Sequence, residues 1–287
     1  MKNKKYRFAL LGTPIAHSLS PEIHRIFAQG CGIDHDMEYV KIETGKAELQ
    51  NAVSRLKCEE FMGFNCTMPL KEEIIKYINV QDEQSQFLGV CNTVKIDSGK
   101  LSAFTTDGDG MVAGLRYNGV EVSDKNIMIF GAGGSAKSVI LSLIRNNARS
   151  ITVLNRSENN LAQVRELFKT YTNVSFGLLI LENIERDIKT QDVLINMSRL
   201  GMSGFEESPD FDTEYNFLSL MKPNSAVADA VYEPLHTKLL TVAAANNLKT
   251  IDGFWMLVYQ GVLAFEIWTG LQVPAESIEA AHRVIKR

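Results

Sequence analysis

One glycine-rich segment constrains the fold of this chain more than any other feature. The apolar run 126–130 has the length of a buried strand, and Gly131, Gly133 and Ala136 follow it in the spacing G-x-G-x-x-A. Residues 136–146 then have the spacing of an amphipathic helix. The first glycine permits a tight turn, the second lets the backbone approach a pyrophosphate, and the small third residue lets helix and strand pack closely. The segment predicts a dinucleotide site, with an ordinary glycine-rich turn as the alternative.

The start of this helix is the expected phosphate site. A helix N-terminus offers unpaired N–H groups and the positive end of the helix dipole to an anion. The predicted cofactor contacts here are Gly131, Gly133, Gly134, Ser135 and Ala136.

Strands alternate with helices along the chain, which predicts an α/β fold with two α/β domains. The 287 residues are too many for one small core. We place the first domain at 1–107 and the second, a Rossmann-type doubly wound domain, at 108–252. Residues 70–78 have helical spacing, and Ser20 is a plausible N-cap for a helix that begins at Pro21. The C-terminal segment 253–287 is expected to be helical and to pack back on the first domain.

Composition excludes several classes of function. The net charge of −4 gives no basic field for nucleic acid or for an anionic membrane. No apolar run is long enough to span a bilayer, and the basic N-terminus is not followed by the apolar core of a signal peptide. The four cysteines form no C-x-x-C pair and the five histidines form no H-E-x-x-H, so a metal site is not expected. Unpaired thiols fit a cytoplasmic protein.

The end of the strand at 150–154 indicates which dinucleotide is bound. An NAD enzyme usually carries an acidic residue there for the ribose diol, whereas this strand ends in Asn155, Arg156 and Ser157. An arginine can pair with a 2′-phosphate, which favours NADP. A solvated surface arginine is the alternative, and the nearby Glu158 weakens the case, so NAD is also possible.

Three polar clusters in the first domain suggest a second binding site. Ser18 and Ser20 precede a helix, where their hydroxyls either cap it or bind a carboxylate. Lys71 follows a buried strand and is a candidate acid or base, although a solvated lysine is the simpler interpretation. Asp107 stands where the first domain meets the second, and its carboxylate could pair with Lys71, although an ordinary Asp-Gly turn is the alternative.

Taken together, these clusters resemble the shikimate dehydrogenase family. The similarity runs nearly from end to end in nine ordered blocks: GTPIAHSLSPEIH, FNCTMPLKE, VCNTV, TDGDG, FGAGGSAKS, LNRS, INMSRLGM, DAVYEPLHTKLL and MLVYQGVLAFEIWTG. Nine blocks in order are highly specific, and they raise Lys71 above the solvated-lysine interpretation.

The resemblance implies a role for individual positions. Ser18 and Ser20 would hold the substrate carboxylate, and Lys71 and Asp107 would form the catalytic pair. The implied partners of the ring hydroxyls are Thr67, Asn92 and Gln260. Gly253 and Met256 would lie beside the nicotinamide. The domain 1–107, completed by helices in 253–287, would bind the substrate, and 108–252 would bind NADP.

The expected reaction is the reversible, NADP-dependent interconversion of 3-dehydroshikimate and shikimate, with a small-molecule substrate and a monomer or homodimer as the assembly. Several positions differ from the family pattern: Cys66, Cys91, Trp255 and Asn160. A quinate/shikimate dehydrogenase that uses NAD, or a paralogue acting on an analogue, is therefore an alternative. A non-catalytic ligand-binding regulator is the alternative from another class. The retained Lys71 and Asp107 argue against it, because a sensor needs no proton shuttle.

Overall fold

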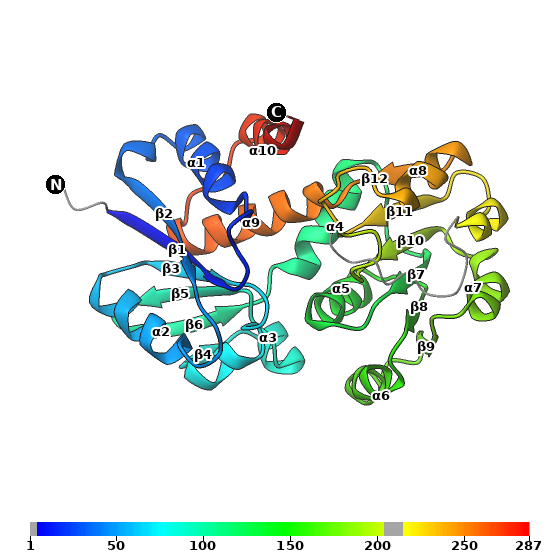
Figure 1. The fold of residues 1–287 in the computed structure, drawn as a ribbon, viewed down its shortest axis with the longest axis horizontal. Coiled ribbons are helices and arrows are strands. Elements are labelled where there is room, and N and C mark those ends of the chain that lie inside the picture. The colour runs from blue at the N-terminus through cyan, green and yellow to red at the C-terminus, as the bar shows by residue number, and fades with distance from the viewer. Residues whose placement is uncertain (1–4, 204–214, 287) are drawn as a thin grey trace. The chain divides into compact units, whose positions relative to one another are not determined.

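The computed structural model describes residues 5–203 and 215–286, and the chain divides into two compact units (Figure 1). Unit 1 contains Met1–Gly110 and Val258–Arg287, and unit 2 contains Met111–Leu257. The C-terminal residues from Val258 onward therefore belong to unit 1. The expected boundaries, Asp107 and Gly253, are the first residues of α4 (Asp107–Tyr117) and α9 (Gly253–Thr269), each of which contributes residues to both units.

Unit 1 is built, within the described residues, on a six-stranded sheet of order β2-β1-β3-β5-β6-β4. The strands are β1 (Tyr6–Gly12), β2 (Met37–Glu43), β3 (Gly63–Cys66), β4 (Val80–Gln81), β5 (Thr93–Asp97) and β6 (Lys100–Phe104). β1 is parallel to β2 and β3, whereas β5 is antiparallel to both of its neighbours. The helices are α1 (Ser20–Gly30), α2 (Leu49–Cys58), α3 (Glu83–Leu88) and α10 (Ala275–His282), with 3-10 turns η1 (Asp34–Asp36), η2 (Glu73–Tyr77) and η4 (Arg283–Lys286).

The alternation of side chains along β1 gives unit 1 two buried faces. Leu11 points to the face that α2 covers, where it joins Val53 and Leu56. Phe8 points to the opposite face, and its ring stacks on Trp268 of α9 with 4.6 Å between the centroids. Phe265 and Trp268 are thus core residues.

Unit 2 contains a parallel sheet of order β12-β11-β10-β7-β8-β9. Its strands are β7 (Asn126–Phe130), β8 (Ser150–Asn155), β9 (Val174–Leu178), β10 (Val193–Asn196), β11 (Ala226–Asp229) and β12 (Lys249–Ile251). The connecting elements are α5 (Gly134–Arg145), α6 (Glu158–Leu167), α7 (Leu181–Ile188), η3 (Asn216–Leu220) and α8 (Lys238–Ala245). The strand order reverses between β7 and β10, and in open α/β sheets ligands bind at the carboxyl ends of the strands at such a point.

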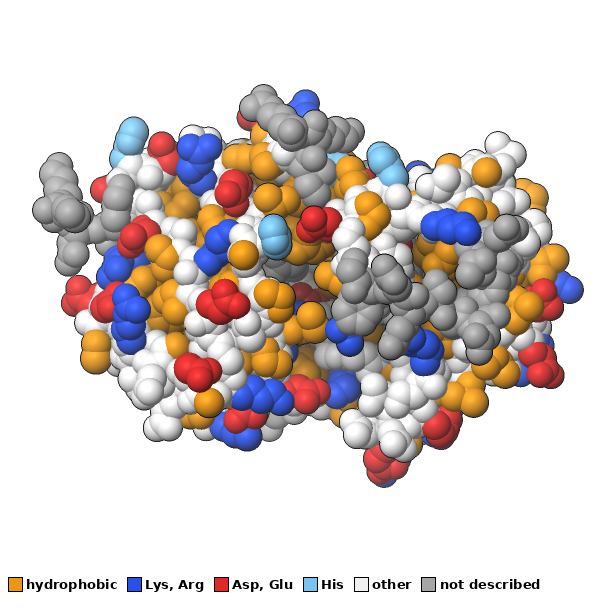
Figure 2. Space-filling model, in the orientation of Figure 1, with side chains coloured by type: hydrophobic (Ala, Val, Ile, Leu, Met, Phe, Trp, Pro, Cys, Tyr) orange, Lys and Arg blue, Asp and Glu red, His pale blue; other side chains and the backbone are white. Residues whose placement is uncertain are grey.

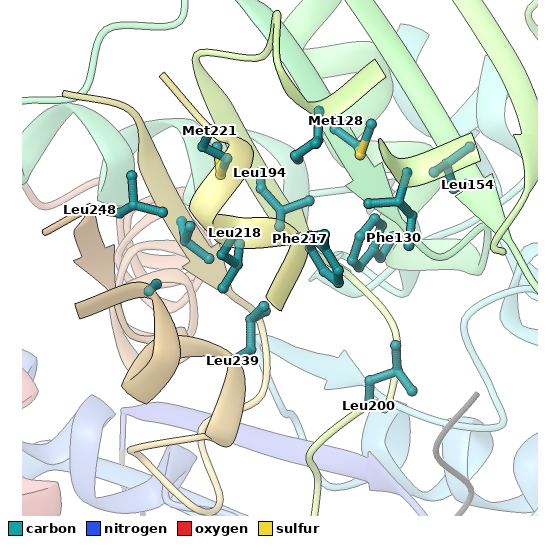
Figure 3. Packing of buried hydrophobic residues seen from close by; sticks show 14 of the residues in the cluster. Met128, Phe130, Leu154, Leu194, Leu200, Phe217, Leu218, Met221, Leu239 and Leu248 are labelled. Carbon is teal, nitrogen blue, oxygen red and sulfur yellow. The ribbon is translucent and has the colours of Figure 1, made fainter. Parts of the chain in front are cut away.

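One face of this sheet is closed by α7, η3 and α8. Figure 3 shows Phe130 of β7 and Phe217 of η3 side by side, and their ring centroids lie 6.0 Å apart in an edge-to-face arrangement. Leu194 of β10 and Leu239 of α8 belong to the same cluster, and each is at most 2% exposed. This packing fixes β7, whose carboxyl end leads into the glycine-rich turn.

Two local predictions from the sequence are wrong. Residues 70–78 do not form an α-helix, because the Lys71 carbonyl accepts a hydrogen bond of 2.8 Å from the Cys91 N–H and only the 3-10 turn η2 forms. Ser20 is not the N-cap of α1. It is the first residue of the helix, and Leu19 is the N-cap, without a side-chain bond. At Lys71, a hydrogen bond with the distant Cys91 replaces the predicted helical hydrogen bonding. At the start of α1, the Ser18 hydroxyl accepts the hydrogen bond of the Ser20 N–H.

The surface matches the weak net charge of the sequence. On the face shown in Figure 2, basic and acidic side chains are interspersed. Among the residues that the structure describes, no helix has the length and apolarity needed to cross a membrane.

Burial of His24 predicts a dependence of stability on pH. The imidazole of His24 stacks on Tyr39 with 4.5 Å between the rings, and its two nitrogens are buried with no hydrogen-bond partner. Burial lowers the pKa of His24 from 6.5 to about 3. Below about pH 6.5 the unfolded chain therefore binds a proton at His24 that the folded chain does not bind. The free energy of unfolding consequently decreases as the pH is lowered from about 6.5 toward 3.

We expect His24→Phe to remove this loss. Between about pH 7.5 and about pH 5 the histidine should cost the wild type about 2 kcal/mol of unfolding free energy that the variant retains. Urea unfolding at both pH values measures the difference. His35→Gln, a change at a histidine whose side chain is 96% exposed, is the control and should keep the wild-type slope. If the unfolding free energies of His24→Phe and the wild type change equally between the two pH values, folded His24 must bind the proton.

Candidate functional site

The centre of the site in unit 1 is an ion pair between Lys71 and Asp107. Lys71 lies beyond the end of β3, Asp107 is the first residue of α4, and the Lys71 Nζ is 2.5 Å from the Asp107 Oδ2. The side chains are 20% and 7% exposed. A solvated helix lysine would not be held in this way. The pair sets an ammonium group and a carboxylate side by side with limited access to water, which is an arrangement that can move a proton.

Asn92 holds the other oxygen of Asp107. Its Nδ2 donates to the Asp107 Oδ1 and to the Thr106 Oγ1, each at 2.9 Å, and its Oδ1 accepts from the Thr106 N–H at 2.7 Å. Asn92 is 4% exposed. The carboxylate is thus fixed at both oxygens, one by Lys71 and one by Asn92, and its orientation does not depend on solvent.

Gln260 of α9 reaches the same group. Its Oε1 lies 3.3 Å from the Asn92 Nδ2, the longest of the three contacts that this nitrogen makes. An amide nitrogen has only two hydrogens for three acceptors. The Gln260 contact is therefore the one that a ligand hydroxyl can replace at least cost. Thr67 is half-buried just after β3, and its N–H donates to the Leu11 carbonyl of β1.

Ser18 and Ser20 form a second group in unit 1. The Ser18 Oγ donates to the Ser20 Oγ at 3.1 Å and accepts from the Ser20 N–H at 3.3 Å. The Ser20 hydroxyl also makes a hydrogen bond with the phenol of Tyr39, whose pKa is raised by burial. Two hydroxyls at the start of α1 are donors that can turn toward a carboxylate.

Asn65 connects the two groups. Its Oδ1 accepts from the Tyr39 hydroxyl at 2.9 Å, and its Nδ2 donates to the Asn92 carbonyl and to the Thr93 Oγ1, each at 3.0 Å. Asn65 and Tyr39 received no role from the sequence. Asn65 stands inside one of the nine blocks, whereas the part played by Tyr39 depends on the register of β2 against β1, which no local pattern reveals.

The two cysteines near Lys71 are buried apolar residues beside the site. Cys66 and Cys91 are buried, and burial raises the pKa of each thiol, to about 12 for Cys91. Thiols held protonated are poor nucleophiles. These departures from the family pattern therefore change the shape of the site rather than its acid–base chemistry.

In unit 2 the glycine-rich turn has the expected strand–turn–helix context. Gly131 has φ +109°, and a Cβ there would lie 2.9 Å from the backbone of Met197, so the turn requires glycine. Gly133 is the N-cap of α5, and a Cβ there would meet nothing within 4 Å. Gly134 and Ser135 form the first turn of α5, and Ala136 is fully buried. The open side of Gly133 is where a phosphate can approach the helix N-terminus.

The end of β8 turns into α6 beside this segment. The Ser157 Oγ accepts from the Asn160 N–H as the N-cap of α6, and the Asn155 Nδ2 donates to the Ser157 carbonyl. Arg156 between them is exposed. Glu158 pairs with Arg165 at 3.3 Å, which partly offsets its negative charge near Arg156.

The start of α9 contributes the last predicted cofactor residues. A Cβ at Gly253 would lie 2.6 Å from the Val231 carbonyl oxygen, so only glycine fits this close approach. Met256 is 9% exposed. The ring of Trp255, one of the positions that differ from the family pattern, packs against Tyr117 of α4 with 4.4 Å between the centroids. The indole is thus accommodated on α4.

Three family models match the chain: the shikimate dehydrogenase substrate binding domain at residues 10–94, shikimate / quinate 5-dehydrogenase at 115–199, and the shikimate 5'-dehydrogenase C-terminal domain at 253–281.

Relatives and solved structures agree with these matches. Shikimate dehydrogenase (NADP(+)) of Alkaliphilus oremlandii is 36% identical over 94% of this chain and 93% of its own length. Shikimate 5-dehydrogenase of Thermus thermophilus, solved with NADP(H) and shikimate, has a TM-score of 0.84 at 30% identity over 98% of this chain and 99% of its own. The Listeria monocytogenes enzyme, solved with shikimate and NAD, has a TM-score of 0.86 at 30% identity over 96% and 95%. The chain belongs to the shikimate dehydrogenase family.

Proposed function

We propose that this protein is an NADP-dependent shikimate dehydrogenase that interconverts 3-dehydroshikimate and shikimate. The observation that carries the proposal is the Lys71–Asp107 pair, whose carboxylate is fixed from the other side by Asn92. Family membership supplies the substrate class, and the pair supplies the proton chemistry that a dehydrogenase of a hydroxyl group needs. We assign substrate binding to unit 1 and dinucleotide binding to unit 2.

The residues of unit 2 fit NADP. Gly133 leaves open space at the N-terminus of α5, where N–H groups point outward for phosphates. Arg156 follows β8 at the place of a 2′-phosphate partner, and Glu158, which would repel that phosphate, has Arg165 as its own partner. When bound, NADP supplies the hydride acceptor or donor of the reaction.

Lys71 is the proposed acid and base. In the oxidation of a ring hydroxyl, the Lys71 Nζ takes the hydroxyl proton as the ring C–H gives up its hydride. In the reduction, the ammonium group returns the proton to the carbonyl oxygen. Asp107 orients the Nζ through the hydrogen bond that its Oδ2 accepts. Asn92 keeps Asp107 in place, so the direction of the Nζ is set before substrate arrives.

The hydroxyls of Ser18 and Ser20 are the proposed carboxylate partners, each giving up a hydrogen bond within the protein for a stronger one to an anion. Thr67, Asn92 and Gln260 are the proposed partners of the ring hydroxyls. Gln260 gives up the longest contact of the Asn92 amide when a hydroxyl binds. Recognition of both the carboxylate and the hydroxyls would restrict the site to small hydroxy acids.

A second candidate function is oxidation of quinate or use of NAD. It is favoured by the family model named for both shikimate and quinate, and by the structural relative solved with NAD. Asn160 adds to it, because its N–H is used by the Ser157 cap and its amide carries no positive charge for a 2′-phosphate.

We place the enzyme in the cytoplasm, where its four free cysteines stay reduced.

Replacement of Lys71 by methionine tests the proton transfer. We expect kcat for shikimate oxidation to fall by about a hundredfold or more, with a much smaller change in KM, because the acid–base group acts in the transition state. Lys76→Met, in the same segment but paired with Glu73 at the surface, should keep the wild-type kcat. An unchanged kcat in Lys71→Met would remove this lysine from the mechanism.

Replacement of Arg156 by glutamine tests cofactor choice. We expect KM for NADP⁺ to rise about tenfold and KM for NAD⁺ to stay the same, since only NADP⁺ carries the 2′-phosphate. Arg149→Gln, just before the opposite end of β8 and paired with Asp124, is the control. Equal effects on both cofactors would contradict a 2′-phosphate contact.

A further inference from the structure

We propose that Lys41 of β2 is a positioning residue for the substrate carboxylate. This inference rests on the proposed function, because it concerns the group that Ser18 and Ser20 would bind. Lys41 belongs to none of the blocks that resemble the family, and it approaches the site only through the pairing of β2 with β1.

The register of the sheet places Lys41 on the right face. Lys41 pairs with Leu10 of β1, and Leu10 pairs in turn with Asn65 of β3. Residues opposite one another in a sheet point to the same side. Lys41 therefore lies on the face that carries Asn65, which is the face covered by α1 and α9.

The segment 13–19 between β1 and α1 carries Ser18 and leads into Ser20. The Lys41 Nζ donates to the Ala16 carbonyl at 2.5 Å and approaches the Ser18 carbonyl at 3.4 Å. Because the ammonium group binds the carbonyls of Ala16 and Ser18, it fixes the backbone that carries the Ser18 hydroxyl.

The neighbours of Lys41 on the same face of β2 hold the same segment. Tyr39 bonds with Ser20, and the Glu43 Oε1 accepts from the Thr13 Oγ1 at 2.7 Å. Three side chains at every second position thus contact the start, the middle and the end of the turn into α1. Of the three, Lys41 alone brings a positive charge, and that charge lies against the backbone of Ser18.

This arrangement gives Lys41 two effects on an anionic substrate. It holds the serine hydroxyls in place, and its charge attracts the carboxylate before and after contact. Both effects act on binding rather than on proton transfer, because neither contact of Lys41 involves Lys71 or Asp107. The bonded carbonyls leave one of the three ammonium hydrogens for solvent or for the carboxylate itself.

The test compares Lys41→Met with Lys41→Arg and with Lys100→Met. Lys100 is the first residue of β6 and lies opposite Asp97 in the backbone register, at the end of the β5–β6 hairpin away from Asn92. Its replacement changes the net charge by the same amount without altering the segment 13–19. We expect Lys41→Met to raise KM for shikimate about fivefold to tenfold, a modest effect because Lys41 is exposed, with kcat and KM for NADP⁺ unchanged. Lys41→Arg should recover most of the loss.

A second measurement, the dependence of KM on salt, separates the charge effect of Lys41 from its effect on the backbone of segment 13–19. Salt should raise KM for shikimate in the wild type, and Lys41→Met should show a weaker dependence on salt. A KM for Lys41→Met that equals that of Lys100→Met would overturn the proposal, as would a fall in kcat of the same size as the rise in KM. If the wild type does not oxidise shikimate with NADP⁺ or NAD⁺, the proposed function fails instead, which is a distinct result.

Discussion

The hydrogen-bonded ion pair of Lys71 and Asp107 is the contact on which the site depends. A charged pair that is largely removed from water is costly unless its remaining oxygens and protons are satisfied. Here the second carboxylate oxygen is satisfied by Asn92, whose own oxygen is satisfied by the Thr106 N–H. The pair requires the end of β3, the start of β5 and the start of α4 to meet, and the sheet of unit 1 fixes all three.

The fold of each unit follows from where its glycines and its apolar residues stand. In unit 2 the close approach at Gly131 brings the turn after β7 against the backbone that follows β10, at the place where the strand order reverses. In unit 1 the two buried faces of β1 require helices on both sides, so the chain returns at its C-terminal end and α9 supplies Trp268 to one face and Gln260 to the site. Packing and function thus share one helix.

Features encoded by neighbouring residues could be predicted from the sequence, whereas features made by distant residues could not. The apolar run 126–130 and the glycine spacing after it gave β7 and its turn. The short η2, by contrast, replaces a predicted helix because Cys91 uses the Lys71 carbonyl. The bonds of Tyr39 and Lys41 depend on the register of β2 against β1, and Asn65 acts through partners on β2 and β5. Lys71 could be singled out only through the ordered family blocks, because composition alone favours a solvated lysine.

The most direct measurement of the central claim is the appearance of reduced nicotinamide when the purified protein is mixed with shikimate and NADP⁺, followed in parallel for Lys71→Met. The account predicts rapid reduction by the wild type and a rate lower by about a hundredfold or more for the variant, with both proteins folded and both binding NADP⁺. Absence of turnover in the wild type with shikimate or quinate and either dinucleotide would contradict it, and so would a variant as fast as the wild type.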